Sequence, residues 1–197
     1  RVENPRFEIA VSGDFDGDGD IDLVDTLNDQ TFLNLGDGTF SDPFPASGQT
    51  GSGPAGASAD FDLDGLPDFV GTYRNINTDG YFIALSNGDG TFTITERVSN
   101  GTFYGYVNIA TADFNGDGYA DFYAKNSIDN YIDFYLNDPL NPGFFSRTTR
   151  YTLPPGSQGV NVSHRDSAYD VGDFTGDGIL DFATAERDAS GDNVIKV

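Results

Sequence analysis

Four copies of one nine-residue pattern constrain the fold of this chain more than any other feature of its sequence. The pattern is Asp-Phe-x-x-Asp-Gly-x-x-Asp, and it begins at residues 14, 60, 113 and 173. Two carboxylates about 4 Å apart repel each other by roughly 4 kcal/mol at an effective dielectric constant near 20, so a cation is expected among them. The alternative is a solvated acidic turn, because Asp and Gly are common turn residues.

The four copies, called loops 1 to 4 from here on, span residues 14–22, 60–68, 113–121 and 173–181. Oxygen-bearing side chains at alternate positions around a sharp glycine turn are typical of loops that wrap a hard divalent cation, most often Ca²⁺. The third position is Asp, Asp, Asn or Thr, and each of these offers an oxygen. The seventh position varies freely, as expected of a residue that binds through its backbone carbonyl.

The sequence therefore predicts about four Ca²⁺ ions, one in each repeat, with weaker affinity in loop 4, where Thr175 replaces a carboxylate. The predicted ligands are Asp14, Asp16, Asp18, Asp20 and Asp22; Asp60, Asp62, Asp64, Leu66 and Asp68; Asp113, Asn115, Asp117, Tyr119 and Asp121; and Asp173, Thr175, Asp177, Ile179 and Asp181. A helical EF-hand is excluded, because none of the residues at the twelfth position of these loops is the Glu which that motif requires. The Phe at the second position is expected to anchor each loop in a hydrophobic core.

The spacing of the loops predicts a repeat protein. A period of this length is typical of stacked units or propeller blades. Each complete repeat reads as four short strands with Gly, Asn and Asp turns and without helical periodicity, which predicts an all-β architecture with one small sheet per repeat. We expect a single domain over residues 1–197, with repeats at about 7–47, 55–98, 106–150 and 166–197.

The loop pattern is paired with a second motif, Gly-Asp-Gly-Thr-Phe, at residues 36–40 and 88–92. Together the two motifs resemble the FG-GAP or VCBS repeat family, whose blades also occur in integrin α-chain propellers. The resemblance implies a β-propeller of four-stranded blades, with one calcium ion in the loop between the first two strands of each blade. It does not imply a particular ligand, because such propellers serve adhesion, sugar binding and, as accessory domains, enzymes.

The fourth repeat is truncated, because its fourth strand and its Gly-Asp-Gly-Thr-Phe turn are missing from the sequence. A propeller normally needs four to eight blades to close its ring. Three explanations remain open: a piece of a larger propeller, a small ring whose last sheet is completed by Val2 to Phe7, and a subunit whose open blade is completed by another chain. The last explanation predicts a homo-oligomer or filament.

Charge and composition narrow the partners. The formal charge is −22, and 28 of the 32 acidic residues are Asp. We expect no nucleic acid partner, because phosphate binding needs a basic surface. We also expect no membrane insertion, because no apolar run is long enough for a span. Acidic calcium loops suit a compartment with millimolar calcium, so the protein is predicted to be extracellular, either secreted or on the cell surface.

The sequence favours binding or assembly over catalysis. There is no Cys, and the single His164 lies in a His-Arg-Asp triplet without the rest of a kinase signature. The expected partner is a glycan or an extracellular protein, and the alternatives are a self-assembling structural subunit and an accessory or catalytic propeller of a carbohydrate-active or phosphodiester-active enzyme. Candidate contacts are Tyr73, Arg74, Asn75, Phe103, Tyr104, Tyr106 and Tyr151, although most such aromatic residues are expected to be packing residues. The tract Gly48–Ser58 is read either as a flexible loop or as a strand of small residues near a propeller axis.

Overall fold

A computed structural model describes residues 9–48, 52–74, 79–99, 106–126, 131–152, 169–176, 181–187 and 193–196. In this part of the chain all regular structure is β, in three four-stranded antiparallel sheets and one three-stranded sheet. The described residues include no helix that is long and apolar enough to cross a membrane. The all-β prediction is therefore confirmed for the described residues.

Each sheet is formed by one repeat, with its strands in chain order. Sheet 1 holds β1 (Ile9–Gly13), β2 (Asp22–Asp25), β3 (Gln30–Phe32) and β4 (Phe44–Pro45), and sheet 2 holds β5 (Ser52–Ala59), β6 (Asp68–Arg74), β7 (Asp79–Ser86) and β8 (Phe92–Ser99). Sheet 3 holds β9 (Tyr106–Ala112), β10 (Asp121–Asn126), β11 (Tyr131–Asp138) and β12 (Asn141–Thr152), and sheet 4 holds β13 (Tyr169–Gly172), β14 (Asp181–Arg187) and β15 (Asn193–Lys196). Four strands in each of the first three repeats are what the sequence predicts.

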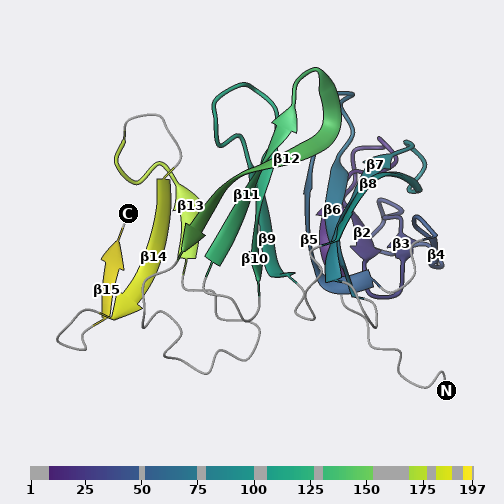
Figure 1. Ribbon diagram of the computed structural model, residues 1–197. Helices are drawn as coiled ribbons and strands as arrows, with labels where there is room; N and C mark the ends of the chain where they lie inside the picture. Colours follow the sequence, from purple (N-terminus) through teal and green to yellow (C-terminus); the bar gives the residue numbers. More distant parts are fainter. Residues whose placement is uncertain are drawn as a thin grey trace.

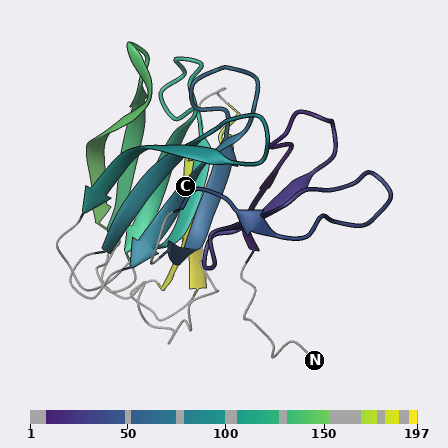
Figure 2. The same cartoon turned by 90° about the vertical axis from the view of Figure 1, so that its right-hand side faces the viewer.

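The sheets follow one another in chain order, from sheet 1 on the right of Figure 1 to sheet 4 on the left. Figure 2 looks at this series from the sheet 1 end, so that the strands of sheets 2 to 4 overlap in projection. Sheets 1 and 4 lie at opposite ends, and the described strands do not close into a ring. The propeller that the resemblance implies therefore remains a prediction.

The first strands of sheets 1 to 3 lie next to one another. The hydroxyl of Ser58 in β5 donates a hydrogen bond to the carbonyl of Ser12 in β1, with an O···O distance of 2.8 Å. The hydroxyl of Thr111 in β9 donates in turn to the carbonyl of Ser58, at 3.1 Å. The strand interpretation of the small-residue tract is thus confirmed for Ser52–Ser58, because small side chains let these strands approach closely.

Sheet 2 is buried on both faces, because it lies between sheets 1 and 3. Phe69 and Phe82 pack toward sheet 1 in one core cluster, while Val70 and Ile83 pack toward sheet 3 in another. Antiparallel strands with one solvent-exposed face alternate apolar and polar residues, whereas β6 and β7 have apolar residues at consecutive positions. The aromatic rings of both clusters meet edge to face, with Phe69 and Phe92 at 4.7 Å and Tyr81 and Phe122 at 4.9 Å between centroids. Each such pair adds about 0.5–1.5 kcal/mol beyond the area that it buries.

Candidate metal sites

Loops 1 to 3 connect the first and second strands of their sheets and share one pattern of hydrogen bonds. The carboxylate of the first Asp accepts the backbone N–H of the sixth residue, which is Gly, at 3.0, 3.0 and 2.8 Å in the three loops. The third residue accepts the N–H of the fifth, and the fifth accepts the N–H of the seventh. These bonds turn the side chains of alternate residues toward the inside of the loop.

The backbone conformation explains why the sixth position of each loop is Gly. Gly19, Gly65 and Gly118 have φ angles of 97°, 94° and 90°. This left-handed region penalises any residue with a β-carbon, so the sharp turn of the loop needs Gly there. The recurrence of Gly at this position in the sequence is thereby explained.

The ninth Asp of each of these loops has a second role, which the sequence reasoning missed. Asp22, Asp68 and Asp121 have no exposed surface. One oxygen of each accepts the N–H of the loop Phe, at 2.8 to 2.9 Å. The other oxygen accepts the N–H of a residue that lies on the third strand or two residues beyond its end, also at 2.8 to 2.9 Å. The ninth Asp therefore fastens its loop to its own sheet, whether or not it also binds a metal.

Burial changes the protonation of these carboxyl groups. Desolvation raises the pKa of Asp68 to about 7, although the N–H groups of Ser86 and Phe61 act in the opposite direction. Burial is also the main cause of the raised pKa of Asp22 and of Asp121. A nearby cation would favour the charged carboxylate and oppose this effect.

Loops 1 and 2 each gather three carboxylates whose oxygens lie within 4.8 Å of one another, namely Asp14, Asp16 and Asp18, and Asp60, Asp62 and Asp68. In the first group Oδ1 of Asp14 is buried and has no hydrogen-bond partner in the structure. A buried oxygen without a partner is costly, and a cation at this position would satisfy it. All-oxygen ligands are the donor set that Ca²⁺ prefers. The residues present thus fit a calcium ion.

The other predicted ligands are placed less uniformly. The side chain of Asp20 is not in the loop 1 group, and its Oδ2 lies so close to Gly36 that a β-carbon there would be 2.8 Å away. In loop 3, Nδ2 of Asn115 donates to Oδ2 of Asp117 at 3.0 Å. The carbonyl ligands at Asp20, Leu66, Tyr119 and Ile179 remain predictions.

Loop 4 departs from the pattern of the first three. The N–H that binds Oδ2 of Asp181 comes from Thr175, at 2.8 Å, and not from the loop Phe. Phe174 is 50% exposed, whereas Phe15 and Phe61 have no exposed surface. The expected anchoring by Phe is therefore confirmed for loops 1 and 2 and wrong for loop 4, although the local sequence is nearly the same. Asp177 and Ile179 lie outside the described residues.

The aromatic candidates for ligand binding do not form one described site. Tyr73 packs against the core between sheets 1 and 2, so it is a packing residue. Tyr151 is 43% exposed on β12. Arg74 and Tyr106 lie in strands, but their side chains are outside the description, and Asn75, Phe103, Tyr104 and His164 lie outside the described residues.

The fold and the loops define a class: an all-β repeat protein in which an acidic, glycine-containing loop follows the first strand of each sheet. The comparison with protein families agrees, because residues 60–124 match the family model of the FG-GAP-like repeat. This part of the chain, which contains loop 2, β6, β7, β8, β9 and loop 3, is similar to the FG-GAP-like repeat. The resemblance stated from the motifs is thereby confirmed. A search of the curated proteins found no significant match.

The FG-GAP-like repeat suggests a β-propeller-like extracellular binding module, and domains of this kind are typically not catalytic.

Proposed function

We propose that this chain is a calcium-stabilised extracellular binding module, built as a β-propeller or part of one, that recognises a glycan or another protein and does not catalyse a reaction. The binding of calcium is supported by the cluster of three carboxylates in loop 1, in which Oδ1 of Asp14 is buried without a hydrogen-bond partner. The extracellular part follows from the FG-GAP-like repeat and from the millimolar calcium that such acidic loops match.

Calcium would act on stability through the loops. Loops 1 and 2 each lie between two strands and carry a Phe that packs between sheets, so an ion that holds one of these loops also holds its Phe in place. If free calcium exceeds the dissociation constant about 100-fold, each site that binds only the folded chain adds roughly 2.7 kcal/mol. Four Ca²⁺ ions would carry eight positive charges and change the formal charge from −22 to about −14.

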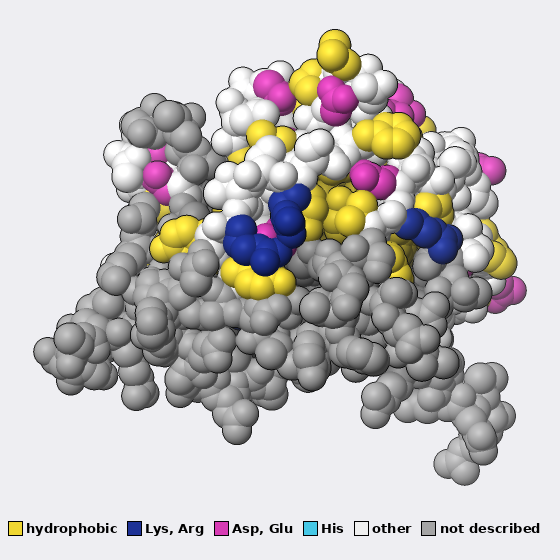
Figure 3. Space-filling model, viewed as in Figure 1, with side chains coloured by type: hydrophobic (Ala, Val, Ile, Leu, Met, Phe, Trp, Pro, Cys, Tyr) yellow, Lys and Arg dark blue, Asp and Glu magenta, His cyan; other side chains and the backbone are white. Residues whose placement is uncertain are grey.

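The surface argues against nucleic acid as the partner. Acidic side chains are scattered over the face shown in Figure 3, and the few Lys and Arg side chains there are confined to small groups. A strongly acidic surface repels phosphate, whereas neutral glycans and proteins do not require a basic patch.

The test is thermal unfolding of the full chain in 2 mM CaCl₂ and in excess EDTA, concentrations chosen near the millimolar range of extracellular calcium modules. We expect a melting temperature several degrees lower in EDTA. An Asp16→Asn variant should lose part of this difference, whereas Asp42→Asn, at an exposed position outside the loops, should keep all of it. An equal melting temperature with and without EDTA would overturn the calcium proposal.

Self-assembly is a second candidate function, and one observation favours it. The loop Phe at one end of the series, Phe174, is 50% exposed, and at the other end Phe40 is 41% exposed. Phe40 is the last residue of the Gly-Asp-Gly-Thr-Phe motif in repeat 1, and Phe92 is its equivalent in repeat 2. Phe92 is buried against Phe15, the loop Phe of the preceding sheet, with 5.1 Å between the ring centroids. The two ends of the series therefore carry the two unpaired halves of one contact. Light scattering after size exclusion, with calcium and with EDTA, tests this candidate: a calcium-dependent oligomer that Phe40→Ala dissociates would support it, and a monomer would overturn it.

A further inference from the structure

Asn115 and Gly116 in loop 3 form an Asn-Gly pair, the dipeptide that loses ammonia most readily without an enzyme. In this reaction the backbone nitrogen of the Gly attacks Cγ of the Asn side chain and closes a succinimide ring. A β-carbon on the second residue would hinder the attack, and Gly has none. The printed sequence contains three such pairs, at residues 87–88, 100–101 and 115–116, and the second of them lies outside the described residues.

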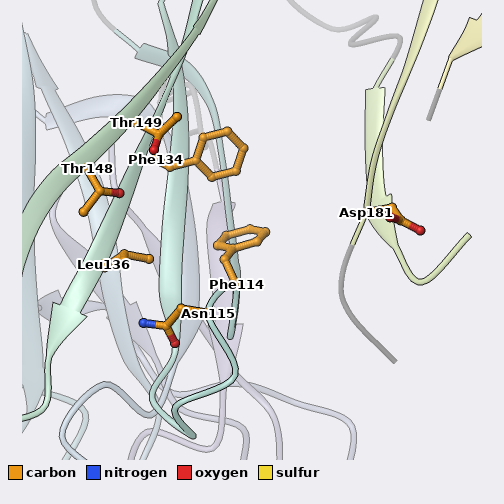
Figure 4. Close-up of a pocket in the computed structure, with 7 residues that line it drawn as sticks. All are labelled: Phe114, Asn115, Phe134, Leu136, Thr148, Thr149 and Asp181. Carbon is orange, nitrogen blue, oxygen red and sulfur yellow. The ribbon is translucent and has the colours of Figure 1, made fainter. Parts of the chain in front are cut away.

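The surroundings of Asn115 leave room for the reaction. Asn115 and Gly116 are both exposed, and a β-carbon built on Gly116 would meet nothing within 4 Å. Figure 4 shows the amide of Asn115 turned away from the rings of Phe114 and Phe134, beside a pocket of about 310 Å³ that these three residues help to line. Water can therefore reach Cγ, and ammonia can leave.

The hydrogen bonds of loop 3 match the charge changes that the reaction requires. Oδ1 of Asn115 accepts the N–H of Asp117 at 2.9 Å, and Nδ2 donates to Oδ2 of Asp117 at 3.0 Å. Negative charge develops on Oδ1 during the attack, so a donor at this distance stabilises the transition state. The N–H of Gly116 donates to Oδ1 of Asp113 at 2.7 Å. A carboxylate in this place draws the proton away from the nitrogen that must attack.

The Asn87-Gly88 pair has the same local sequence but different contacts. Oδ1 of Asn87 accepts the hydroxyl of Thr93 at 2.9 Å, and Nδ2 donates to the hydroxyl of Thr91 at 3.0 Å. The amide is thus held between two side chains at the start of β8. The N–H of Gly88 donates to a neutral hydroxyl at 3.2 Å, and a β-carbon on Gly88 would lie 3.2 Å from Cδ1 of Leu66. This pair is therefore the internal reference for loop 3.

Loop 1 shows that the fold accommodates the product of the reaction. Asp16 and Gly17 stand there at the positions of the Asn-Gly pair of loop 3. Oδ1 of Asp16 accepts the N–H of Asp18 at 3.2 Å, as Oδ1 of Asn115 accepts the equivalent N–H. The φ angles of Gly17 and Gly116 are 77° and 75°. A carboxylate can therefore replace the amide without a change in the turn of the loop.

We propose that Asn115 is a site of spontaneous deamidation, through which loop 3 acquires a further carboxylate. The bond between the nitrogen of Gly116 and Cγ of Asn115 forms, and the bond between Cγ and Nδ2 breaks. The proton of the Gly116 N–H leaves with Nδ2 as ammonia. Water then opens the succinimide ring at either carbonyl, which gives an Asp or an isoaspartyl residue.

The Asp product makes the first six residues of loop 3 identical to those of loop 1. The reaction thus changes the number of carboxylates that loop 3 can offer to a cation, a consequence that rests on the proposed function. The deamidation itself involves no metal. A test in EDTA therefore separates a failure of this inference from a failure of the calcium proposal.

The test is incubation of the full chain in EDTA at neutral pH, with and without urea, followed by peptide mapping with fragment mass spectrometry. The change to be followed at each Asn is the replacement of NH₂ by OH. We expect similar rates at Asn87 and Asn115 in urea. In the folded chain Asn115 should react about tenfold faster than Asn87, a small part of the gain that a positioned proton acceptor gives in enzymes. A rate at Asn115 no higher than at Asn87 in the folded chain would overturn the proposal.

The nature of the product checks the route. An isoaspartyl residue at position 115 requires the succinimide, whereas direct hydrolysis of the amide gives Asp alone. The Asn115→Asp variant provides the chromatographic standard for the Asp product. A product that consists of Asp alone would overturn the attack by Gly116.

A variant of Asp113 checks the contribution of the loop. Asp113→Asn removes the carboxylate that accepts the N–H of Gly116, so it should slow the reaction at Asn115 several-fold in the folded chain. Asp42→Asn, at an exposed position outside the loops, is the matched control and should leave the rate unchanged. A rate in Asp113→Asn equal to or above that of the parent chain would contradict the role of these hydrogen bonds.

Discussion

Phe61 and Asp68 close loop 2 by a hydrogen bond, in which the backbone N–H of Phe61 donates to Oδ2 of Asp68 at 2.8 Å. The other oxygen, Oδ1, accepts the N–H of Ser86 at 2.8 Å. One buried side chain thus joins the loop to the third strand of its sheet, and the loop Phe is held where the next sheet can cover it.

Replacement of Asp68 by Asn should destabilise the chain even without metal. An amide offers one acceptor oxygen and an NH₂ group, so one of the two backbone N–H groups would face another donor. A buried donor without a partner costs about 1–3 kcal/mol. Urea unfolding in excess EDTA would measure this loss separately from any lost metal binding. Asp42→Asn, at an exposed position, serves as the control and should change the stability by no more than about 0.5 kcal/mol.

The loop phenylalanines should differ sharply in their contribution to stability. Phe61→Ala empties a fully buried position between sheets 2 and 3 and should cost about 3–5 kcal/mol. Phe174→Ala, at the same position of loop 4, removes a side chain that is 50% exposed and should cost within about 0.5 kcal/mol. Denaturant unfolding of both variants gives the comparison. Similar losses for the two would show that loop 4 is anchored as the others are.

Glu96 should make the stability depend on pH. Burial raises the pKa of Glu96 above its ordinary value of 4.5, and the N–H of Phe145 only partly opposes this. The folded chain therefore holds the proton more tightly than the unfolded chain does. The stability from this group is complete below about pH 4.5 and is lost as the pH rises through the raised pKa.

A Glu96→Gln variant isolates this effect, because its amide oxygen can still accept the N–H of Phe145 but cannot ionise. The difference in unfolding free energy between this variant and the parent chain should therefore grow in favour of the variant from pH 4 to pH 8. Chemical unfolding across this range, in EDTA, provides the measurement. A difference that stays constant with pH would contradict the burial of a charged Glu96.

Arg150 should stabilise sheet 3 through Asp133, which has no exposed surface. Nε and a terminal nitrogen of Arg150 bind the two carboxylate oxygens of Asp133 at 2.7 and 2.8 Å, and the guanidinium lies 3.6 Å from the centroid of the Tyr131 ring. Arg150→Ala should cost about 1.5–3 kcal/mol, the range for hydrogen bonds to charged groups. The loss is moderated because Arg147 lies 3.5 Å from the same carboxylate.

The control for Arg150 is Arg97→Ala, at an exposed position on β8, which should be close to neutral. Thermal unfolding of the two variants under identical salt gives the comparison. Equal melting temperatures would mean that Asp133 does not depend on its bidentate partner.

Much of the fold could be predicted from the sequence, because its determinants are local. The alternation of Asp and Gly in each loop follows from the turn and from the hydrogen bonds within nine residues. The strands of sheets 1 to 3 follow from short apolar runs between turns. The burial of Phe15 could be predicted because Phe recurs at the second position of every loop.

The rest depends on contacts between repeats, which a local pattern does not reveal. The hydroxyl of Ser86 and Nδ2 of Asn137 donate to the carbonyls of Phe15 and Phe61, which lie 71 and 76 residues earlier in the sequence. Phe174 lies in a nearly identical local sequence but is exposed, because burial is decided by the neighbouring sheet. The hydrogen-bonding role of the ninth Asp could not be predicted for another reason. A metal ligand and an acceptor of backbone N–H groups both require an Asp at the same position, so the sequence pattern does not distinguish them.

The contacts between consecutive sheets also set an order of events during synthesis. The ring of Phe15 and the carbonyl of the same residue are covered by groups of sheet 2 as distant as Phe92. A ribosome that adds 5–20 residues per second needs roughly 4–15 s to make the residues between Phe15 and Phe92. The loop Phe of a newly made repeat therefore stays uncovered until the next repeat has been synthesised. Slower translation would lengthen the time in which a newly made repeat is exposed to chaperones and to unwanted association.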